Sequence, residues 1–151
     1  MTDWIEREQT YLMHTYARLP VVLERGQGCW VWDTAGKKYL DMVAGIAVNV
    51  LGHCHPAVTD ALIKQCQTLI HTSNLYYTMP QIELAQLLVE HSCASRVFFA
   101  NSGAEANEGA IKLARKWGQA NRGGAYEIIS TRSSFHGRTL ATVTATAQEK
   151  Y

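Results

Sequence analysis

The sequence has few residues of the kinds that cross-link a chain or interrupt regular structure. Its 151 residues include 4 cysteines and 3 prolines, and no two cysteines are spaced C-x-x-C. We expect reduced, unpaired thiols, as is usual in a cytosolic protein, rather than a disulfide framework. The run His53-Cys54-His55 has no second pair of ligands spaced to complete a tetrahedron, so the sequence favours no metal site.

Excess charge and long apolar runs are also missing. The chain has 14 Lys and Arg against 13 Asp and Glu, a net charge of +1, so neither nucleic acid nor an anionic membrane is an expected partner. No apolar run approaches the roughly 20 residues of a membrane-spanning helix. The first residues, MTDWIEREQTYL, are polar and of mixed charge, unlike a secretory signal or a transit peptide. We therefore expect a cytoplasmic protein.

A strand–turn–helix pattern at residues 96–118 is the strongest feature that the sequence does contain. The short apolar run at 97–99 predicts a strand buried on both faces, and turn residues at 101–103 interrupt it. Beyond them, apolar residues recur at helical spacing, with acidic residues early and basic residues late, as the helix dipole favours. Gly118 is expected just past the end of this helix.

The start of this helix offers a site for an anion. Its first backbone N–H groups have no partner within the helix, and the small side chains of Gly103 and Ala104 let an anion approach them closely. An ordinary turn that binds nothing fits the same residues equally well. The turn is not a nucleotide P-loop, since G-x-x-x-x-G-K-[ST] is absent, and it lacks the spaced glycines of a dinucleotide fingerprint.

Helical and alternating patterns divide the rest of the chain into short elements. Helices are predicted at residues 3–15, 56–70 and 80–91. Strands are predicted at residues 21–24, 29–33 and 38–43, joined by glycine-bearing turns into an antiparallel meander. Residues 44–55 are expected to be irregular. A further strand is predicted at 126–131, a polar loop at 133–139, and a helix in preference to a strand at 140–147.

Two predicted strands joined through a helix make a βαβ unit. Both strands end in polar loops, so the turn at residues 101–103 and the loop at 135–138 are expected to face one crevice. A parallel sheet normally has several strands and is covered by helices on both faces. With only two candidate strands, the chain is expected to be the front part of a larger domain.

The run Asn101-Ser102-Gly103-Ala104-Glu105-Ala106-Asn107-Glu108 resembles the cofactor-phosphate loop of class III pyridoxal-phosphate aminotransferases. The resemblance covers essentially all 151 residues and is closest to the acetylornithine aminotransferases. It implies an α/β protein of the fold-type I pyridoxal-phosphate-dependent transferases, here incomplete. Residues 1–50 would form the N-terminal helix and antiparallel meander of the small domain. Residues 51–151 would form the first part of the large cofactor-binding domain, truncated.

The cofactor that the resemblance implies is pyridoxal 5'-phosphate. Gly103 and Ala104 would bind its phosphate through backbone N–H groups, with Ser102 nearby. Phe135 resembles the aromatic residue that stacks on its pyridine ring, although a Phe that anchors a loop in the core fits the same pattern. His136 is expected to be a structural hydrogen-bonding residue rather than a general base.

Substrate-binding positions are implied by the same resemblance. Arg138 resembles the arginine that grips the substrate α-carboxylate, a group that its planar fork pairs with in two parallel hydrogen bonds. Tyr16 and residues 45–46 resemble positions that line the substrate mouth, and for Tyr16 a packed linker aromatic is equally consistent. Glu108 either pairs with Lys112 or helps to order the site, and the sequence does not separate the two.

Some parts of the implied active site are absent from this chain. In the family a lysine holds the cofactor and moves the proton, and an aspartate faces the pyridine nitrogen; both lie beyond residue 151. We therefore assign no catalytic residue within this chain. The lysines that lie outside the family's lysine context are Lys37, Lys38, Lys64, Lys112, Lys116 and Lys150.

The implied complete enzyme would transfer the δ-amino group of N2-acetylornithine to 2-oxoglutarate in arginine biosynthesis. It would act as a homodimer with sites at the subunit interface. An ornithine, succinylornithine or 4-aminobutyrate aminotransferase is an alternative, because only a few side chains read the substrate tail. A non-catalytic anion-binding module on the same βαβ unit is an alternative from another class.

The 151-residue chain by itself is predicted to be inactive. Purified and supplied with pyridoxal phosphate, it should form no glutamate from N2-acetylornithine and 2-oxoglutarate, because no residue in it replaces the missing lysine. A coupled glutamate assay measures this. Turnover above that of free cofactor would contradict the prediction.

Overall fold

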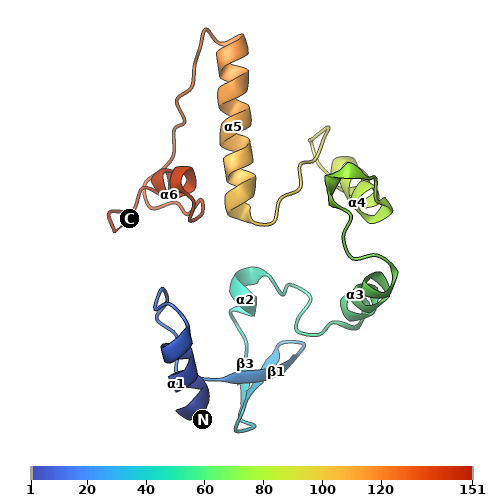
Figure 1. Cartoon of the computed structure of the whole chain (residues 1–151), viewed down its shortest axis with the longest axis vertical. Helices are drawn as coiled ribbons and strands as arrows, with labels where there is room; N and C mark the ends of the chain where they lie inside the picture. The colour runs from blue at the N-terminus through green and yellow to red at the C-terminus, as the bar shows by residue number, and fades with distance from the viewer. Residues whose placement is uncertain (1, 151) are drawn as a thin grey trace. The chain divides into compact units, whose positions relative to one another are not determined.

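The chain forms two compact units, Met1–Leu75 and Tyr76–Tyr151. A computed structural model describes residues 2–150 of them (Figure 1). The division of the chain near residue 50 that the family resemblance implies stays a prediction. In the described residues, no helix is both long enough and apolar enough to span a membrane.

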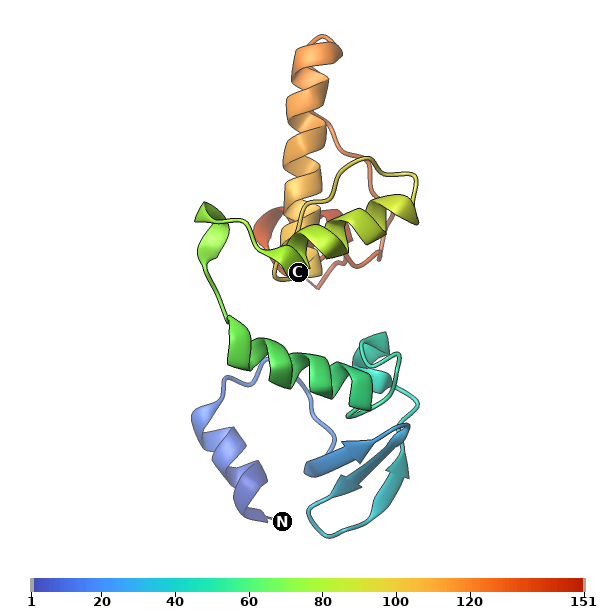
Figure 2. The same cartoon turned by 90° about the vertical axis from the view of Figure 1, so that its right-hand side faces the viewer.

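The first unit contains an antiparallel three-stranded sheet in the order β1-β2-β3, as predicted. The strands are β1 (Leu23–Gln27), β2 (Trp30–Asp33) and β3 (Lys38–Leu40) (Figure 2). The predicted turn at residues 25–28 is wrong, because β1 continues to Gln27 and leaves only Gly28 and Cys29 between the strands. A register shift between Leu23 and Arg25 and the left-handed φ of 56° at Gly28 make this short connection possible.

On one face of the sheet, the side chains of an arginine and a lysine lie over the indole rings of two tryptophans on β2. The guanidinium carbon of Arg25 lies 3.7 Å from the ring centroid of Trp32, and the Nζ of Lys38 lies 3.9 Å from that of Trp30. Such cross-strand contacts contribute roughly 0.5–1 kcal/mol each at exposed sites. On the alternate positions, Val31 is 7% exposed and lies in the sheet's small core.

The side chain of Asp33 fixes the turn between β2 and β3. Its Oδ1 accepts backbone N–H bonds from Ala35 and Lys37, both at 2.9 Å, and its Oδ2 accepts the hydroxyl of Tyr39 at 2.7 Å. The Tyr39 hydrogen bond, with the two N–H groups, holds the pKa of Asp33 below its ordinary value of 3.8. The same bond raises the pKa of Tyr39.

The helices of the first unit are α1 (Thr2–Tyr11), α2 (Ala44–Ala47) and α3 (Pro56–Thr68), followed by the short 3₁₀ helix η1 (Ser73–Leu75). The expected helix at 56–70 is confirmed, with Pro56 at its start. The expected extension of the first helix to residue 15 is wrong. Its end is closed earlier, because the Nε2 of His14 lies 2.9 Å from the carbonyl oxygen of Gln9.

The segment α2 is a turn in the left-handed region. Ala44, Ile46 and Ala47 have φ angles of 49°, 59° and 60°, and Gly45 between them has a φ of 64°. Left-handed backbone costs a residue with a Cβ roughly 1–2 kcal/mol. A run of this kind persists only where surrounding contacts impose it.

The second unit contains α4 (Met79–Glu90), α5 (Gly103–Asn121) and α6 (Leu140–Thr146). The predicted helix at 80–91 and the preference for helix at 140–147 are confirmed. The predicted end of α5 at Gly118 is wrong. Gly118 lies inside the helix, where a Cβ would collide with the carbonyl oxygen of Ala125 as the chain returns. The chain leaves the helix at Gly123 and Gly124, whose φ angles are 62° and 90°.

The predicted strands at residues 97–99 and 126–131 are not strands in this structure. Both segments lack strand pairing among the described residues, and Phe98 and Ile129 are 74% and 97% exposed. A parallel strand exists only beside neighbours that take its backbone hydrogen bonds. Both segments are apolar, as buried strands are. Residues 2–150 do not form the sheet that would pair their backbone and cover their side chains.

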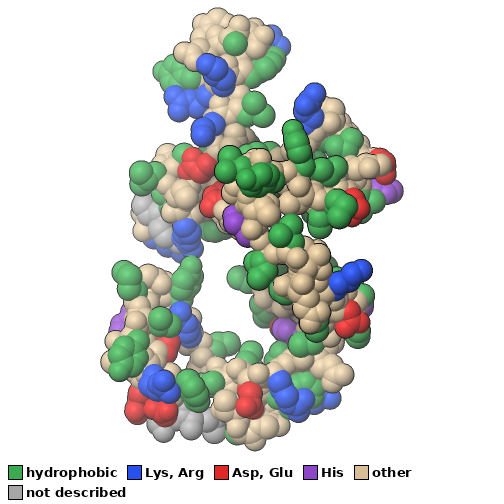
Figure 3. Space-filling view, turned by 45° about the vertical axis from the view of Figure 1, so that its right-hand side comes forward, with side chains coloured by type: hydrophobic (Ala, Val, Ile, Leu, Met, Phe, Trp, Pro, Cys, Tyr) green, Lys and Arg blue, Asp and Glu red, His purple; other side chains and the backbone are tan. Residues whose placement is uncertain are grey.

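The chain exposes far more surface than a complete globular protein of its mass. Its accessible area is 13328 Å², whereas a folded monomer of this size exposes about 7,700 Å². An interface of ordinary size between two domains hides only about 600–1,500 Å², so most of the excess belongs to the units themselves. Hydrophobic side chains are spread over the face drawn in Figure 3.

The Asp33–Tyr39 contact predicts a loss of stability in acid. Because the pKa of Asp33 is lowered by folding, its contribution is present above about pH 4 and is lost as the pH falls through the folded value. Asp33→Asn should therefore reduce the fall in the urea midpoint of the chain as the pH is lowered below about 4. Tryptophan fluorescence measures it. Asp60→Asn, on the exposed side of α3, is the matched control, and an equal effect of both changes would contradict the prediction.

Candidate functional site

The start of α5 is capped by its own sequence. Ser102 is the residue before the helix, and its Oγ accepts the backbone N–H of Glu105 at 3.2 Å. The carboxylate of Glu105 in turn accepts the backbone N–H and the side-chain amide of Asn101, at 2.9 and 3.1 Å. These reciprocal bonds fix the turn in one conformation. The Ser102 hydroxyl hydrogen is still available to a ligand, since the oxygen acts here as an acceptor.

Donors remain open at this helix start. The N–H groups of Glu105 and Ala106 are bonded to Ser102, whereas those of Gly103 and Ala104 have no acceptor among residues 2–150. Gly103 has open space where a Cβ would lie, with no heavy atom within 4 Å. Two N–H groups at a positive helix end, with room in front of them, fit a phosphate oxygen.

The loop at residues 134–139 is bound directly to the first turns of α5. The side-chain amide of Asn107 donates to the carbonyl oxygen of His136 at 2.7 Å. The carboxylate of Glu108 accepts the hydroxyl of Thr139. The described residues show no ion pair between Glu108 and Lys112, so the contact that Glu108 makes is the one that orders the loop. The expected proximity of the turn and this loop is confirmed.

Gly137 is the point of closest approach between the loop and the helix. Its φ is 138°, and a Cβ there would lie 2.6 Å from the Cβ of Ala104 and 2.7 Å from the Oγ1 of Thr142. Only glycine fits this position without displacing the helix start. The loop therefore sits against the residues with the open N–H groups.

Two buried threonines of α6 support the loop from beneath. Thr142 and Thr146 are both 0% exposed. The Oγ1 of Thr146 accepts the backbone N–H of His136, and the Oγ1 of Thr142 accepts that of Thr139, both at 3.0 Å. Loop backbone groups that face the protein are thus satisfied, and the loop has a defined position without strand pairing.

Phe135 and Arg138 lie on the exposed part of the same loop. Phe135 is 66% exposed, and the guanidinium carbon of Arg138 lies 5.2 Å from its ring centroid. His136, between them, has its Nδ1 2.9 Å from the carbonyl oxygen of Ser134, a contact within the loop. An aromatic plane and a guanidinium are therefore presented together, beside the donors of Gly103 and Ala104.

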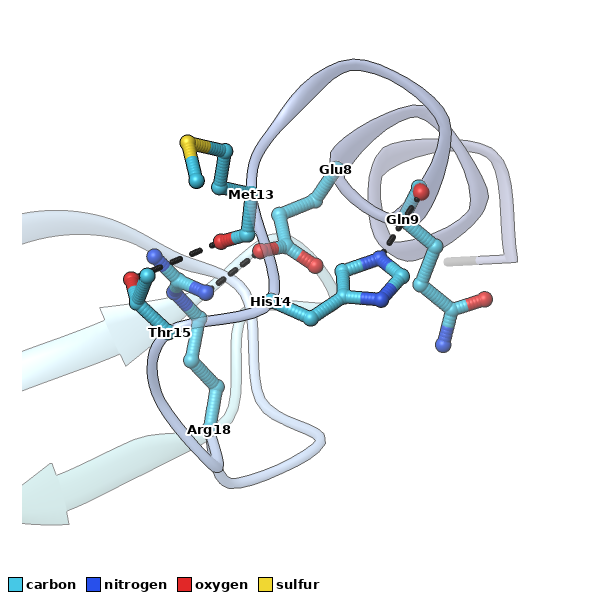
Figure 4. Close-up of polar contacts among 6 residues, drawn as sticks. All are labelled: Glu8, Gln9, Met13, His14, Thr15 and Arg18. Atoms are coloured by element: carbon cyan, nitrogen blue, oxygen red, sulfur yellow. Dashed lines mark hydrogen bonds and ion pairs between the residues drawn. The ribbon is translucent and has the colours of Figure 1, made fainter.

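Tyr16 belongs to the other compact unit, and its relation to the helix start stays a prediction. It lines a pocket of about 560 Å³ with Trp4, His14 and Arg18, and its ring is 65% exposed. The guanidinium of Arg18 pairs with the carboxylate of Glu8 (Figure 4) and lies 5.9 Å from the Tyr16 ring centroid. The segment that carries Tyr16 is therefore tied to α1.

Sequence reasoning missed several residues that build the site. Asn107, Thr142, Thr146 and Gly137 had been given no role, although all of them hold the loop in place. Thr142 and Thr146 stand four residues apart in a helix, a spacing that places two polar groups on one face. That spacing was the one available signal, because a side chain that bonds distant backbone leaves no local pattern. No group of three or more His, Cys, Asp and Glu side chains converges within the described residues.

These features define an α/β protein in which a helix start and its neighbouring loop present N–H donors, an aromatic plane and a guanidinium. Such a set suits a planar ligand that carries phosphate and carboxylate groups. The chain belongs to the aminotransferase class-III family, whose model matches residues 11–151. Its fold is an incomplete fold-type I fold of the pyridoxal-phosphate-dependent transferases.

Relatives with a known name or structure are similar over nearly the whole chain. An acetylornithine aminotransferase of Caldanaerobacter subterraneus subsp. tengcongensis is 60% identical over 148 residues, which are 97% of this chain and 38% of that protein. The ornithine aminotransferase structure from Toxoplasma gondii matches with a TM-score of 0.86 at 32% identity, covering 93% of this chain and 34% of that one. The N-acetylornithine aminotransferase structure from Stenotrophomonas maltophilia matches with a TM-score of 0.76 at 45% identity, covering 88% and 36%.

The chain thus spans well under half the length of the relatives it matches. In a complete α/β domain, further strands pair extended segments such as residues 97–99 and 126–131, and further helices cover apolar surface of this kind.

The close approach at Gly137 predicts a selective loss of stability. Gly137→Ala should lower the free energy of unfolding of the full-length protein by about 1–3 kcal/mol, because the new methyl group overlaps Ala104 and Thr142. Urea unfolding measures this. Gly124→Ala is the matched control, since its φ of 90° is also positive but no atom lies within 4 Å of its Cβ position. Equal losses of stability in the two variants would contradict the prediction. They would mean that the positive φ, and not the contact with Ala104 and Thr142, causes the loss.

Proposed function

We propose that the complete protein is a pyridoxal-phosphate-dependent aminotransferase that transfers the δ-amino group of N2-acetylornithine to 2-oxoglutarate. This reaction belongs to arginine biosynthesis. The observation that carries the proposal is the binding of the Phe135–Arg138 loop to the start of α5, which sets ring, guanidinium and open N–H donors side by side. The identity of 60% to an acetylornithine aminotransferase supports the choice of donor.

Pyridoxal phosphate fits the donors that are present. The N–H groups of Gly103 and Ala104, with the Ser102 hydroxyl, would hold its phosphate, and the open space at Gly103 admits the oxygens. Phe135, exposed beside them, would pack against its ring and exclude water from one face. When bound, the cofactor supplies the electron-accepting ring on which amino-group transfer depends.

Substrate orientation would depend on Arg138. Its planar fork holds a carboxylate in two parallel hydrogen bonds, and this fixes the amino donor against the cofactor. Tyr16, Gly45 and Ile46 would line the mouth through which the donor enters. The lysine that carries the proton and the aspartate that faces the pyridine nitrogen would come from residues beyond 151.

The assembly and location of the enzyme are part of the same proposal. We infer a cytoplasmic homodimer with each site at the subunit interface. The large apolar surface exposed by this chain supports it, since both the missing layers and a partner subunit would cover that surface. Nucleic acid and membranes are not proposed as partners, because the net charge of +1 gives no attraction to either.

An ornithine aminotransferase is a second candidate, favoured by one observation. The TM-score is 0.86 against the Toxoplasma gondii ornithine aminotransferase and 0.76 against the Stenotrophomonas maltophilia N-acetylornithine aminotransferase. The two donors differ in charge at the α-nitrogen, since acetylation removes an ammonium group. Comparing kcat/KM for N2-acetylornithine, ornithine, succinylornithine and 4-aminobutyrate in the full-length enzyme decides between them.

The proposed role of Arg138 predicts a loss of donor recognition. In the full-length enzyme Arg138→Lys should lower kcat/KM for the amino donor about a hundredfold, because the charge remains but the two-bond geometry is lost. Steady-state kinetics measure it, with the cofactor absorbance unchanged.

A matched control lies directly after α5, at the residue that caps the carboxyl end of that helix. The guanidinium carbon of Arg122 lies 5.3 Å from the Trp117 ring, a contact like that of Arg138 with Phe135, but it is remote from the helix start. Arg122→Lys should leave kcat/KM within about twofold. Equal losses in both variants would show that the Arg138 effect is not one of substrate binding.

A further inference from the structure

Three cationic side chains lie on one face of α5. Lys112, Arg115 and Lys116 are spaced three and four residues along the helix, so they are neighbours on its surface, and all three are exposed. Figure 3 shows lysine and arginine side chains gathered over α5, which forms the upper column of that view. This face is therefore strongly basic in a chain whose net charge is only +1.

The described residues do not neutralise these charges. Within residues 2–150, the side chains of Lys112 and Lys116 have no ion pair or hydrogen bond, and the guanidinium of Arg115 has only an aromatic contact. The carboxylate of Glu108, one turn earlier, is bonded to the hydroxyl of Thr139 instead. Like charges four residues apart destabilise a helix. The helix dipole does not offset this, because it acts at the helix ends and the last turn of α5 has no basic residue.

The three cations line a pocket between α5 and the chain that returns beside it (Figure 1). Its volume is about 750 Å³, and its lining also includes Gln119 of α5, Tyr126 of the returning segment and Ala141 of α6. The ring of Tyr126 is 62% exposed, and the guanidinium carbon of Arg115 lies 5.7 Å from its centroid. All of these residues belong to the second compact unit. A pocket of this size suits a small molecule rather than a single ion.

The lining indicates the chemistry of the ligand. Three cations within little more than one turn of helix attract a group with several negative charges, and a phosphate carries roughly −1.5 to −2 at pH 7. Ammonium and guanidinium groups both bind phosphate. The exposed ring of Tyr126 offers a plane on which a flat heterocycle stacks. A planar base that carries two or more phosphate groups combines both features.

We propose that this pocket is a binding site for a nucleoside polyphosphate, with its base on Tyr126 and its phosphates on Lys112, Arg115 and Lys116. Arg115 comes twelve residues after Gly103, so roughly 18 Å of helix separates it from the open N–H groups. The ligand therefore does not compete for the donors assigned to the cofactor phosphate. The inference does not depend on the reaction or the amino donor proposed above.

The test uses the full-length protein saturated with pyridoxal phosphate, so that the cofactor donors are occupied. ADP, pyrophosphate and adenosine are titrated separately by isothermal calorimetry without divalent cations. ADP should bind at one site per chain. Pyrophosphate should bind about tenfold more weakly, because it cannot stack on Tyr126, and adenosine more weakly still, because it carries no phosphate. Added salt should weaken the binding of ADP, since charge attraction dominates it.

Two variants separate the parts of the site. Lys116→Gln removes one of the three charges and should weaken ADP binding about tenfold. Tyr126→Leu keeps an apolar side chain but removes the ring, so it should weaken ADP binding to the level of pyrophosphate and leave pyrophosphate binding unchanged. Unchanged pyrophosphate binding also shows that this variant is folded.

Arg122→Gln is the matched control for the loss of charge. It removes one charge from a cation that also lies over an aromatic ring, 5.3 Å from the centroid of Trp117, but that does not line the pocket. It should leave the affinity for ADP within about twofold.

Equal weakening by Lys116→Gln and Arg122→Gln would mean a general attraction to a basic surface, and the inference would be wrong. It would also be wrong if pyrophosphate bound as tightly as ADP, which leaves no role for the ring, or if none of the three ligands bound. Because binding is measured without turnover, a failure of the proposed transfer reaction would leave these results interpretable.

Discussion

The contact on which the candidate site depends is the one between Gly137 and Ala104. A glycine with a φ of 138° lets the loop backbone lie against the helix start. This contact brings the side chains of the loop close to the open N–H groups of Gly103 and Ala104. The side-chain amide of Asn107 donates to the carbonyl oxygen of His136 beside this contact, at 2.7 Å. The open N–H groups of the helix start then lie beside the loop that carries the Phe135 ring and the Arg138 guanidinium, although about 30 residues separate the helix start from the loop along the chain.

Two carboxylates do comparable structural work in the other unit. Asp33 and Asp41 each take two backbone N–H groups with one oxygen and a side-chain donor with the other. Asp41 differs from Asp33 in the turn that it stabilises. The turn after Asp41 is a run of residues with left-handed backbone, among which the side chain of Ile46 is exposed. Backbone strain kept in place by a single polar group is typical of segments that have a function other than stability.

The local elements were largely predictable, because periodicity, glycine-bearing turns and Pro56 act over a few residues. Helices α3, α4 and α6 and the antiparallel meander were expected close to where they occur. The strands predicted at 97–99 and 126–131 are not formed, since no neighbouring strand among residues 2–150 takes their backbone hydrogen bonds. The end of α5 was placed too early, because Gly118 looks like a helix terminator until the passing backbone of Ala125 is known. The structural roles of Asn107 and Thr146 were missed, because the backbone groups that they bind, both at His136, are distant from them in the sequence.

The two unpaired extended segments, residues 97–99 and 126–131, also favour association of this chain with other extended chains. Each carries apolar side chains and a row of backbone donors and acceptors that no strand among residues 2–150 satisfies. Such a row is a template for pairing with any other extended chain. By itself, this polypeptide is therefore expected to self-associate. Other copies of the chain would pair with the same two segments that native neighbouring strands would pair with. The order in which these edges become covered decides whether the chain assembles or aggregates.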